Sequence, residues 1–413
     1  MIDRELEEFL EVFGAVLIVG PKWCGKTTTA KRLAKSVLSL QDEDQLKNNR
    51  EIAEFKISIL LKGENPRLLD EWQAIPRLWD AVRFEVDNRG ETGLFILTGS
   101  VTVDNSRISH SGAGRIARLK MGTMSLYEQG LSTGEVSLGG LFAGQTDVSG
   151  TSNLSYSDIA EAIVRGGWPE SVGKTVDHAR KMITGYCGAI VESDISMADG
   201  RQRDGVRAES ILRSLSRGVS SPVNDSSVWK DVSSDPDGPH RNTVSGYISA
   251  LEAICVVDDL PAWQPNLRSK AAVRAGRVRH LADPAIAAHF LEASPEDLER
   301  DPRTFGLLFE SMAVRDLRAY AQAIGGIVRH YRDGDGLEAD AIVHLRNGKW
   351  GAFEVKLGQH STDAAAESLK RLRDKVDPDR EHPPSFLAVI TGAEHAYRRS
   401  DGVFVIPLGC LRE

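Results

Sequence analysis

The chain has 413 residues, of which 41% are hydrophobic and 27% are charged. This length suggests about three domains, each able to bury a core of its own. The formal net charge of -8 gives no global attraction to nucleic acid or to an anionic membrane, so such binding would need a local patch. The four cysteines include no Cys-x-x-Cys pair, which argues against a disulfide framework and a structural zinc site. The N-terminus is acidic and no apolar run approaches membrane-spanning length, so we expect a cytoplasmic protein with no membrane partner.

Residues 20–27 read Gly-Pro-Lys-Trp-Cys-Gly-Lys-Thr and lie between an apolar, strand-like stretch and a segment typical of a helix. This order predicts a P-loop, in which backbone N–H groups and a helix N-terminus bind phosphate. We expect ATP as the ligand, with Lys26 at the β- and γ-phosphates and Thr27 on Mg²⁺. The residues expected to contact the nucleotide are Gly20, Pro21, Lys22, Trp23, Cys24, Gly25, Lys26, Thr27, Thr28, Thr98 and Ser100.

Cys24 has two interpretations. A thiol at a helix N-terminus beside Lys26 is expected to have a lowered pKa and to oxidise readily. Alternatively, Cys24 is a small residue that fits the loop.

Two further segments predict the rest of an ATPase site. Asp70 and Glu71 end a predicted strand, where one carboxylate supports Mg²⁺ through its water and the other orients the attacking water. Thr98 and Ser100 end a neighbouring strand at 94–98 and either contact the γ-phosphate or are ordinary turn residues. Arg115 is either an arginine finger, in cis or from a neighbouring subunit, or a solvated surface residue. Strands alternating with helices predict a parallel α/β sheet with its chemistry at the carboxyl ends.

The middle of the chain is predicted to be helical. Residues 130–156 are rich in Gly, Ser and Thr and predict a long loop, as do residues 219–239. Residues 241–251 predict a helix with Val244, Ile248 and Leu251 on one face, and an apolar strand at 254–257 follows. This is the arrangement of a winged helix, which binds DNA or serves only as a packing module. The basic residues that follow and that would neutralise phosphates are Arg268, Lys270, Arg274, Arg277 and Arg279.

A hairpin near the C-terminus carries charged residues whose positions depend on its register. A three-residue turn at 346–348, with Gly348 left-handed, pairs Asp340 with Glu354, whereas a two-residue turn does not. Side-chain alternation favours the three-residue turn, because one face is then apolar and the other carries the charges. An ordinary hairpin with a solvated face is the alternative.

Short motifs follow one another along the chain: the P-loop and residues 69–73, 96–100, 113–115, 124–128 and 166–170. Their order resembles that of prokaryotic AAA-type ATPases that carry a C-terminal domain of unknown function, DUF4143. The resemblance covers most of the chain. Two features depart from the pattern: Arg67 lies inside a strand that should be apolar, and Trp23-Cys24 are unusual in a P-loop.

DUF4143 domains are similar to PD-(D/E)xK nucleases, and the C-terminal residues resemble that signature. The resemblance implies that Asp340 and Glu354 coordinate Mg²⁺ and that Lys356 positions the attacking water, with Glu310 from the helix at 305–323 on the same metal-binding face.

The sequence therefore predicts an α/β fold with three parts. These are an AAA-type P-loop NTPase domain at 1–155, a helical and winged-helix-like connector at 156–265, and a restriction-endonuclease-like α/β domain at 266–413. The predicted function is ATP binding and hydrolysis with action on DNA. The alternative is a nucleotide-controlled switch whose nuclease-like domain is inactive and binds a protein partner. Expected partners are ATP, DNA and a second copy of the chain.

Overall fold

The computed structural model describes residues 2–99, 111–233, 238–265, 276–376 and 382–413. Ser100, Arg268, Lys270 and Arg274 lie outside the described residues. The chain forms two compact units. Unit 1 comprises Met1–Gly122, Glu192–Arg203 and Ser249–Val256, and unit 2 comprises Thr123–Val191, Asp204–Ile248 and Val257–Glu413.

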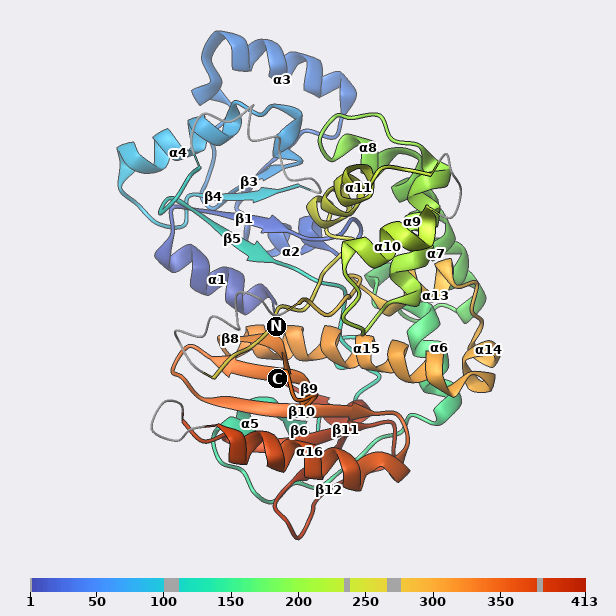
Figure 1. The fold of residues 1–413 in the computed structure, drawn as a ribbon. Coiled ribbons are helices and arrows are strands. Elements are labelled where there is room, and N and C mark those ends of the chain that lie inside the picture. The colour runs from blue at the N-terminus through green and yellow to red at the C-terminus, as the bar shows by residue number, and fades with distance from the viewer. Residues whose placement is uncertain (1, 100–110, 234–237, 266–275, 377–381) are drawn as a thin grey trace. The chain divides into compact units, whose positions relative to one another are not determined.

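Unit 1 is built on a five-stranded parallel sheet with the strand order β2-β3-β4-β1-β5 (Figure 1). The strands are β1 (Ala15–Val19), β2 (Ser36–Ser39), β3 (Arg67–Asp70), β4 (Phe95–Thr98) and β5 (Ile116–Lys120). The helices are α1 (Ile2–Val12), α2 (Lys26–Leu33), α3 (Glu43–Lys56), α4 (Leu78–Arg89) and α8 (Ile195–Met197), with short 3-10 turns η1 (Ile57–Ile59) and η2 (Trp72–Ala74). The predicted parallel α/β sheet is confirmed.

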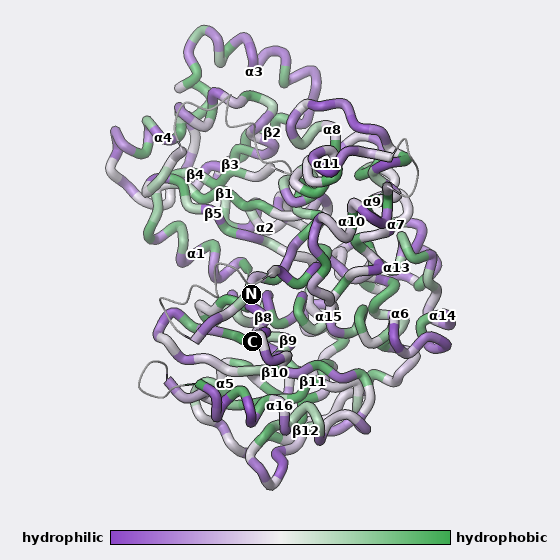
Figure 2. Tube along the Cα trace, viewed as in Figure 1, coloured by the Kyte–Doolittle hydropathy of each residue, from purple (hydrophilic) through white to green (hydrophobic). Residues whose placement is uncertain are grey.

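The sheet of unit 1 is buried on both faces, which explains its apolar strands. Along β1, Ala15 and Leu17 belong to a core formed with α3 and α4, whereas Val16 and Ile18 pack in a second core with α1 and α2. The strand β1 is accordingly green in Figure 2. Arg67 begins β3 and is accommodated at its edge, because its guanidinium donates to the carbonyl of Leu60 and to the hydroxyl of Ser36, both at 3.0 Å.

Unit 2 contains a seven-stranded mixed sheet with the order β7-β12-β13-β11-β10-β9-β8. Its central pairs, β10 with β11 and β11 with β13, are parallel. The strands are β7 (Gly150–Thr151), β8 (Gly326–Arg332), β9 (Glu338–Leu345), β10 (Trp350–Lys356), β11 (Phe386–Thr391), β12 (His395–Arg398) and β13 (Phe404–Pro407), and β6 (Val136–Ser137) pairs separately with β14 (Leu411–Arg412). Figure 1 shows the helices α15 (Pro302–Ala323) and α16 (Thr362–Lys375) on opposite sides of this sheet.

Shorter helices make up the rest of unit 2. They are α5 (Leu138–Phe142), α6 (Tyr156–Arg165), α7 (Val176–Ala189), α9 (Gly205–Arg217), α10 (Asp225–Val232), α13 (Pro284–Phe290) and α14 (Pro295–Arg300), with 3-10 turns η4 (Pro169–Ser171), η6 (Gln359–Ser361) and η7 (Leu408–Cys410). Two elements contribute residues to both units: the π-helical stretch η5 (Ile190–Asp194) and α11 (Arg241–Ala253). No helix of the described chain is both long and apolar enough to cross a membrane.

Two loop predictions are wrong. Residues 130–156 hold β6, α5 and β7. The strands β6 and β7 form because they pair with strands near the C-terminus, and strands of two residues are too short to show an apolar period in the sequence. Residues 219–239 hold α10, which Asn224 caps by accepting a hydrogen bond from the N–H of Ser227. The strand predicted at 254–257 is reduced to isolated antiparallel bridges, which join Val257 to Leu281 and Leu260 to Val278.

The predicted hairpin register is confirmed. Ala341 pairs with Phe353 and His344 with Trp350, so that Asp340 and Glu354 come next in the same register. Gly348 in the turn has a φ of +84°. The prediction of one apolar and one charged face is wrong, because Ile342, Trp350 and Ala352 lie on the charged face and are fully buried in the core against α16.

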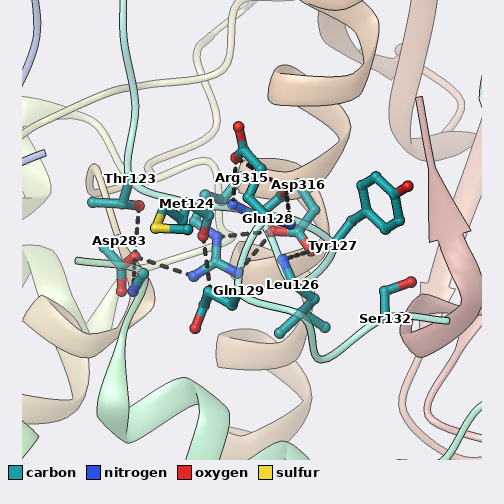
Figure 3. Close-up of polar contacts among 12 residues, drawn as sticks. Thr123, Met124, Leu126, Tyr127, Glu128, Gln129, Ser132, Asp283, Arg315 and Asp316 are labelled. Carbon is teal, nitrogen blue, oxygen red and sulfur yellow. Dashed lines mark hydrogen bonds and ion pairs between the residues drawn. The ribbon is translucent and has the colours of Figure 1, made fainter. Parts of the chain in front are cut away.

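The motif at 124–128 belongs to a buried network of ionic and hydrogen-bonded residues in unit 2 (Figure 3). Arg315 on α15 pairs with Asp283 at 3.1 Å and with Asp316 at 2.7 Å. Asp316 accepts a hydrogen bond from the N–H of Leu126, and Asp283 accepts one from the hydroxyl of Thr123. The network therefore fixes the segment 123–126 to α15 and to the start of α13, and this accounts for the motif without a ligand.

Candidate functional site

The P-loop has the local geometry that a phosphate requires. It connects β1 to α2, and Trp23 and Gly25 have left-handed φ angles of +64° and +104°. A Cβ atom at Gly20 would lie 2.1 Å from the carbonyl oxygen of Met121, so this position accepts only glycine. Thr28 is exposed in the first turn of α2.

Lys26 is buried within the loop. Its ammonium donates to the carbonyl oxygens of Gly20 at 3.0 Å and Pro21 at 2.8 Å. Carbonyls are weaker partners for an ammonium than the ionised oxygens of a phosphate. The cation is thus held by exchangeable contacts at the place where a phosphate would enter, and the loop fits the β- and γ-phosphates of a nucleotide.

Asp70 is the centre of the polar edge of this sheet. Its buried carboxylate accepts hydrogen bonds from the hydroxyl of Thr27 at 2.7 Å and from the hydroxyl of Thr98 at 2.6 Å. Thr98 lies beside Asp70 because the two residues are paired in the parallel register of β3 and β4. The amide of Gln41 donates to the second carboxylate oxygen at 3.2 Å. No local sequence pattern indicates Gln41, although its position just after β2 places it at the same edge.

Glu71 leaves the sheet in a left-handed conformation, with a φ of +56°. Its carboxylate accepts a hydrogen bond from the amide of Gln73. The other amide atom, Gln73 Oε1, is buried and has no hydrogen-bond partner in the described structure. Gly99 lies against this group, since a Cβ there would come within 2.4 Å of Gln73 Oε1. Gln73 Oε1, an unpaired acceptor beside Glu71, could accept a hydrogen bond from a water molecule bound there.

The remaining P-loop side chains differ in exposure. Trp23 is 56% exposed, whereas Cys24 is fully buried. Burial raises the pKa of the Cys24 thiol, so the interpretation of Cys24 as a reactive thiol is wrong and it is a residue that fits the loop. Lys22 forms an ion pair of 2.6 Å with Asp194, and no local sequence pattern predicts this pairing.

The structure does not bring Arg115 to the P-loop of its own chain. Arg115 precedes β5, whose first residue, Ile116, pairs with Ala15 at the start of β1. The P-loop follows the carboxyl end of β1, so Arg115 and the P-loop lie at opposite ends of the strands. The guanidinium of Arg115 is bound instead to Asp87 on α4, at 2.7 Å.

The C-terminal charged residues form a second cluster, in unit 2. The Lys356 ammonium lies 2.7 Å from Glu354 and 3.2 Å from Asp340, so it bridges the two carboxylates. Asp340 also accepts the N–H of Val355 at 2.7 Å. Burial and then the charge of Asp340 raise the pKa of Glu354 to about 8, and the same two causes raise that of Glu310 well above its ordinary value.

Glu310 is within electrostatic reach of this cluster, but no hydrogen bond or ion pair in the described structure joins it to the other three residues. No group of three or more His, Cys, Asp or Glu side chains among the described residues is arranged to hold a metal ion. The cation between Asp340 and Glu354 is therefore the ammonium of Lys356.

The described basic residues after α11 differ in their exposure to solvent. Arg277 is exposed. Arg279 is buried and pairs with Asp259 at 2.8 Å and with Asp225 at 3.1 Å. The prediction that Arg279 is available to phosphates is therefore wrong, because its charge is already neutralised in the core.

Family models match three segments of the chain. Residues 13–129 match the AAA domain, residues 156–297 a domain of unknown function (DUF8612), and residues 305–411 another domain of unknown function (DUF4143). The chain carries an AAA domain and a C-terminal DUF4143 domain. Both predicted assignments are confirmed, and the AAA domain contains the P-loop, Asp70 and Thr98 described above.

No curated protein matches the chain by sequence. Among solved structures, the chain is similar to the Walker-type ATPase of Pyrococcus abyssi, with 14% identity, a TM-score of 0.41 and coverage of 70% of this chain and 94% of that one. It is also similar to a variant of RuvB from Thermotoga maritima, with 17% identity, a TM-score of 0.29 and coverage of 71% and 94%.

Proposed function

We propose that the protein binds ATP with Mg²⁺ in the P-loop of unit 1 and hydrolyses it. The observation that carries this proposal is the contact of Thr27 with Asp70, which puts a hydroxyl and a carboxylate side by side at the carboxyl edge of a parallel sheet, next to Lys26. Hydroxyl and carboxylate oxygens are the ligands that Mg²⁺ takes beside nucleotide phosphates.

Each residue at this edge has a distinct role in the proposal. Lys26 and the loop N–H groups hold the phosphates, and Thr27 and Asp70 hold Mg²⁺, which when bound neutralises charge developing on the phosphoryl oxygens. Glu71 orients the attacking water, and Thr98 and Gln41 keep the Asp70 carboxylate in place. Thr98 donates to the same carboxylate oxygen as Thr27, so it positions Asp70.

The test uses two variants of the full chain. Lys26→Ala should abolish ATP binding, whereas Glu71→Gln should keep binding and lower turnover by at least about 100-fold, because only the water-orienting carboxylate is lost. Lys31→Ala, which removes an exposed lysine of the same helix, is the matched control and should do neither. Undiminished hydrolysis by both site variants would refute the proposal.

A second candidate function is Mg²⁺-dependent DNA cleavage by the DUF4143 domain. It is supported by the joint contact of Lys356 with Asp340 and Glu354, and by the raised pKa values of Glu354 and Glu310, which reflect carboxyl groups crowded together in a buried place. A divalent cation relieves such crowding. Asp340 and Glu354 would then bind the metal and Lys356 would position the water.

Cleavage of plasmid DNA with and without Mg²⁺ tests this second candidate. Asp340→Ala and Lys356→Ala should abolish cleavage, while Glu367→Ala, an exposed acid on α16, should retain it. An intact enzyme that hydrolyses ATP but never cuts DNA would favour the alternative, a nucleotide-controlled switch whose inactive domain binds a protein partner.

DNA contact is proposed to run through α11 and the arm that the bridges at 257–260 and 278–281 define. Val244, Ile248 and Leu251 bury one face of α11, which leaves its polar face outward as in a winged helix. Binding by this module is expected to be electrostatic, so the affinity for DNA should fall steeply with salt, and Arg277→Ala should flatten the slope.

ATP hydrolysis in mixtures of Lys26→Ala and Arg115→Ala chains tests a homo-oligomer. Restored hydrolysis in such a mixture requires Arg115 of one chain to act in trans at the P-loop of another.

A further inference from the structure

Lys22 places a second cation in the P-loop, and this cation is engaged by a carboxylate from a distant part of the sequence. Its ammonium pairs with Asp194 at 2.6 Å. The two residues are far apart in sequence but belong to the same compact unit. The Lys22 side chain is 35% exposed and that of Asp194 is 5% exposed, so solvent reaches the lysine but hardly reaches the aspartate.

Asp194 belongs to a segment that has structure of its own. It is the last residue of the π-helical stretch η5. Such stretches are rare in proteins, but where they occur they are often at functional sites. Beyond it, Arg203 donates to both carboxylate oxygens of Asp199, at 2.6 and 2.8 Å, and to the carbonyl of Ile195 at 2.8 Å. Residues 192–203, here called the sensor segment, are thus braced internally and are bound to the P-loop through Asp194.

Two anions compete for Lys22 once a nucleotide is present. A triphosphate brings several negative charges into the loop that carries Lys22, and charge-assisted contacts with phosphate are strong. A single carboxylate cannot match them, yet Asp194 is buried and is left without its cation if Lys22 departs, which is unfavourable. The phosphate and Asp194 therefore compete for Lys22.

We infer that Lys22 exchanges Asp194 for the terminal phosphate of ATP, so that triphosphate binding releases the sensor segment from the P-loop. This inference rests on the proposed ATP-binding function and assigns Lys22 as a positioning residue for the nucleotide and Asp194 as its competitor. The sensor segment belongs to unit 1 and begins shortly after α7 in the chain.

The test combines a double-mutant cycle with hydrogen exchange on the full chain. Dissociation constants for ATP and ADP are measured by titration for the wild type, Asp194→Asn, Lys22→Met and the double variant. Asp194→Asn should tighten ATP binding by about tenfold and ADP binding by much less, because the competitor of the terminal phosphate is weakened. The same substitution in the Lys22→Met background should have no effect. Glu85→Gln, which removes a surface ion pair of α4 with Arg89, is the matched control.

Hydrogen exchange does not require Asp194→Asn and therefore covers the case in which that variant fails to fold. ATP should speed amide exchange in residues 192–203 of the wild type, ADP should do so less, and Lys22→Met should abolish the difference. ATP binding that leaves both the exchange and the variant affinities unchanged would overturn this inference alone. If the wild type binds neither nucleotide, the proposed function fails as well.

Discussion

Asp70 is a buried carboxylate whose partners come from different parts of unit 1. Thr27 belongs to the first turn of α2, Thr98 to the end of β4, and Gln41 to the connection after β2. A buried charge without such donors would cost several kcal/mol. These hydrogen bonds therefore fix the pair of oxygens, from Thr27 and Asp70, that the proposed Mg²⁺ site requires.

Thr98→Val tests the role of one of these donors. Valine keeps the shape of threonine and removes the hydroxyl, so Asp70 should remain buried with looser orientation. We expect kcat for ATP to fall by about tenfold with little change in nucleotide affinity. Thr184→Val on α7, in unit 2, is the control for a threonine-to-valine change. A Thr98→Val protein with the kcat of the wild type would show that Thr98 does not position Asp70.

Glu354 should make the stability of the protein depend on pH. Its pKa is raised from 4.5 to about 8 by burial and by Asp340, so between these values the folded chain keeps a proton that the unfolded chain releases. Its contribution to stability is thus present below pH 4.5 and is lost as the pH rises toward 8.

Glu354→Gln removes this proton equilibrium. The variant should be more stable than the wild type at pH 8.5 by on the order of 2 kcal/mol, and the difference should shrink toward pH 5. Urea unfolding at both pH values, followed by circular dichroism, measures it. Glu299→Gln, at an exposed position of α14, should give no such dependence. A constant difference between the two pH values would argue against the raised pKa.

At the scale of elements, the motif at 166–170 meets the motif at 124–128 through backbone contact. The N–H of Met124 donates to the carbonyl of Gly167 at 2.7 Å, and the N–H of Gly167 donates to Asp283 at 3.0 Å. Trp168, next in the chain, is buried against Tyr186 with ring centroids 4.9 Å apart. The motifs thus hold the start of unit 2 together with α7, α13 and α15.

Gly167→Ala should destabilise unit 2. A Cβ at this position would lie 2.3 Å from the carbonyl oxygen of Met124, which is backbone and cannot move aside cheaply. We expect a loss of about 2 to 4 kcal/mol in the free energy of unfolding. Gly185→Ala on the same unit is the matched control, because the space around Gly185 in α7 is open and alanine favours a helix by about 1 kcal/mol. Equal stability of the two variants would contradict the close approach.

For the whole molecule, the two candidate sites belong to different compact units: the P-loop to unit 1 and the Lys356 cluster to unit 2. A ligand stabilises the part of a protein that binds it, by about 2.7 kcal/mol when its concentration is 100 times the dissociation constant. Saturation with ATP should therefore protect the amides of β1, β3 and β4 against hydrogen exchange far more than those of β10 and β11. Equal protection of both sheets would mean that the two units unfold as one. Lys26→Ala is the control, because it should lose the protection that ATP gives.

Features that depend on neighbouring residues or on turn type can be predicted from local sequence. Strand, loop and helix around Gly20–Thr27 follow from consecutive residues, because the backbone of that loop alone shapes a phosphate cradle. The AAA and DUF4143 assignments follow from ordered motifs. The register of β9 with β10 follows from the three-residue turn with a left-handed Gly348, because both faces of the hairpin carry buried apolar residues and alternation alone does not distinguish them.

The partners of buried charges follow from tertiary contacts, because desolvation depends on residues far away in the chain. Asp194 gives no local sign that it pairs with Lys22, and Arg279 looks like a surface cation until Asp225 and Asp259 surround it. Arg115 lies at the wrong edge of the sheet for its own P-loop because the parallel register of β1 and β5 places it there. Short strands such as β7 form only when a distant strand supplies their hydrogen bonds, and no local pattern encodes that partner.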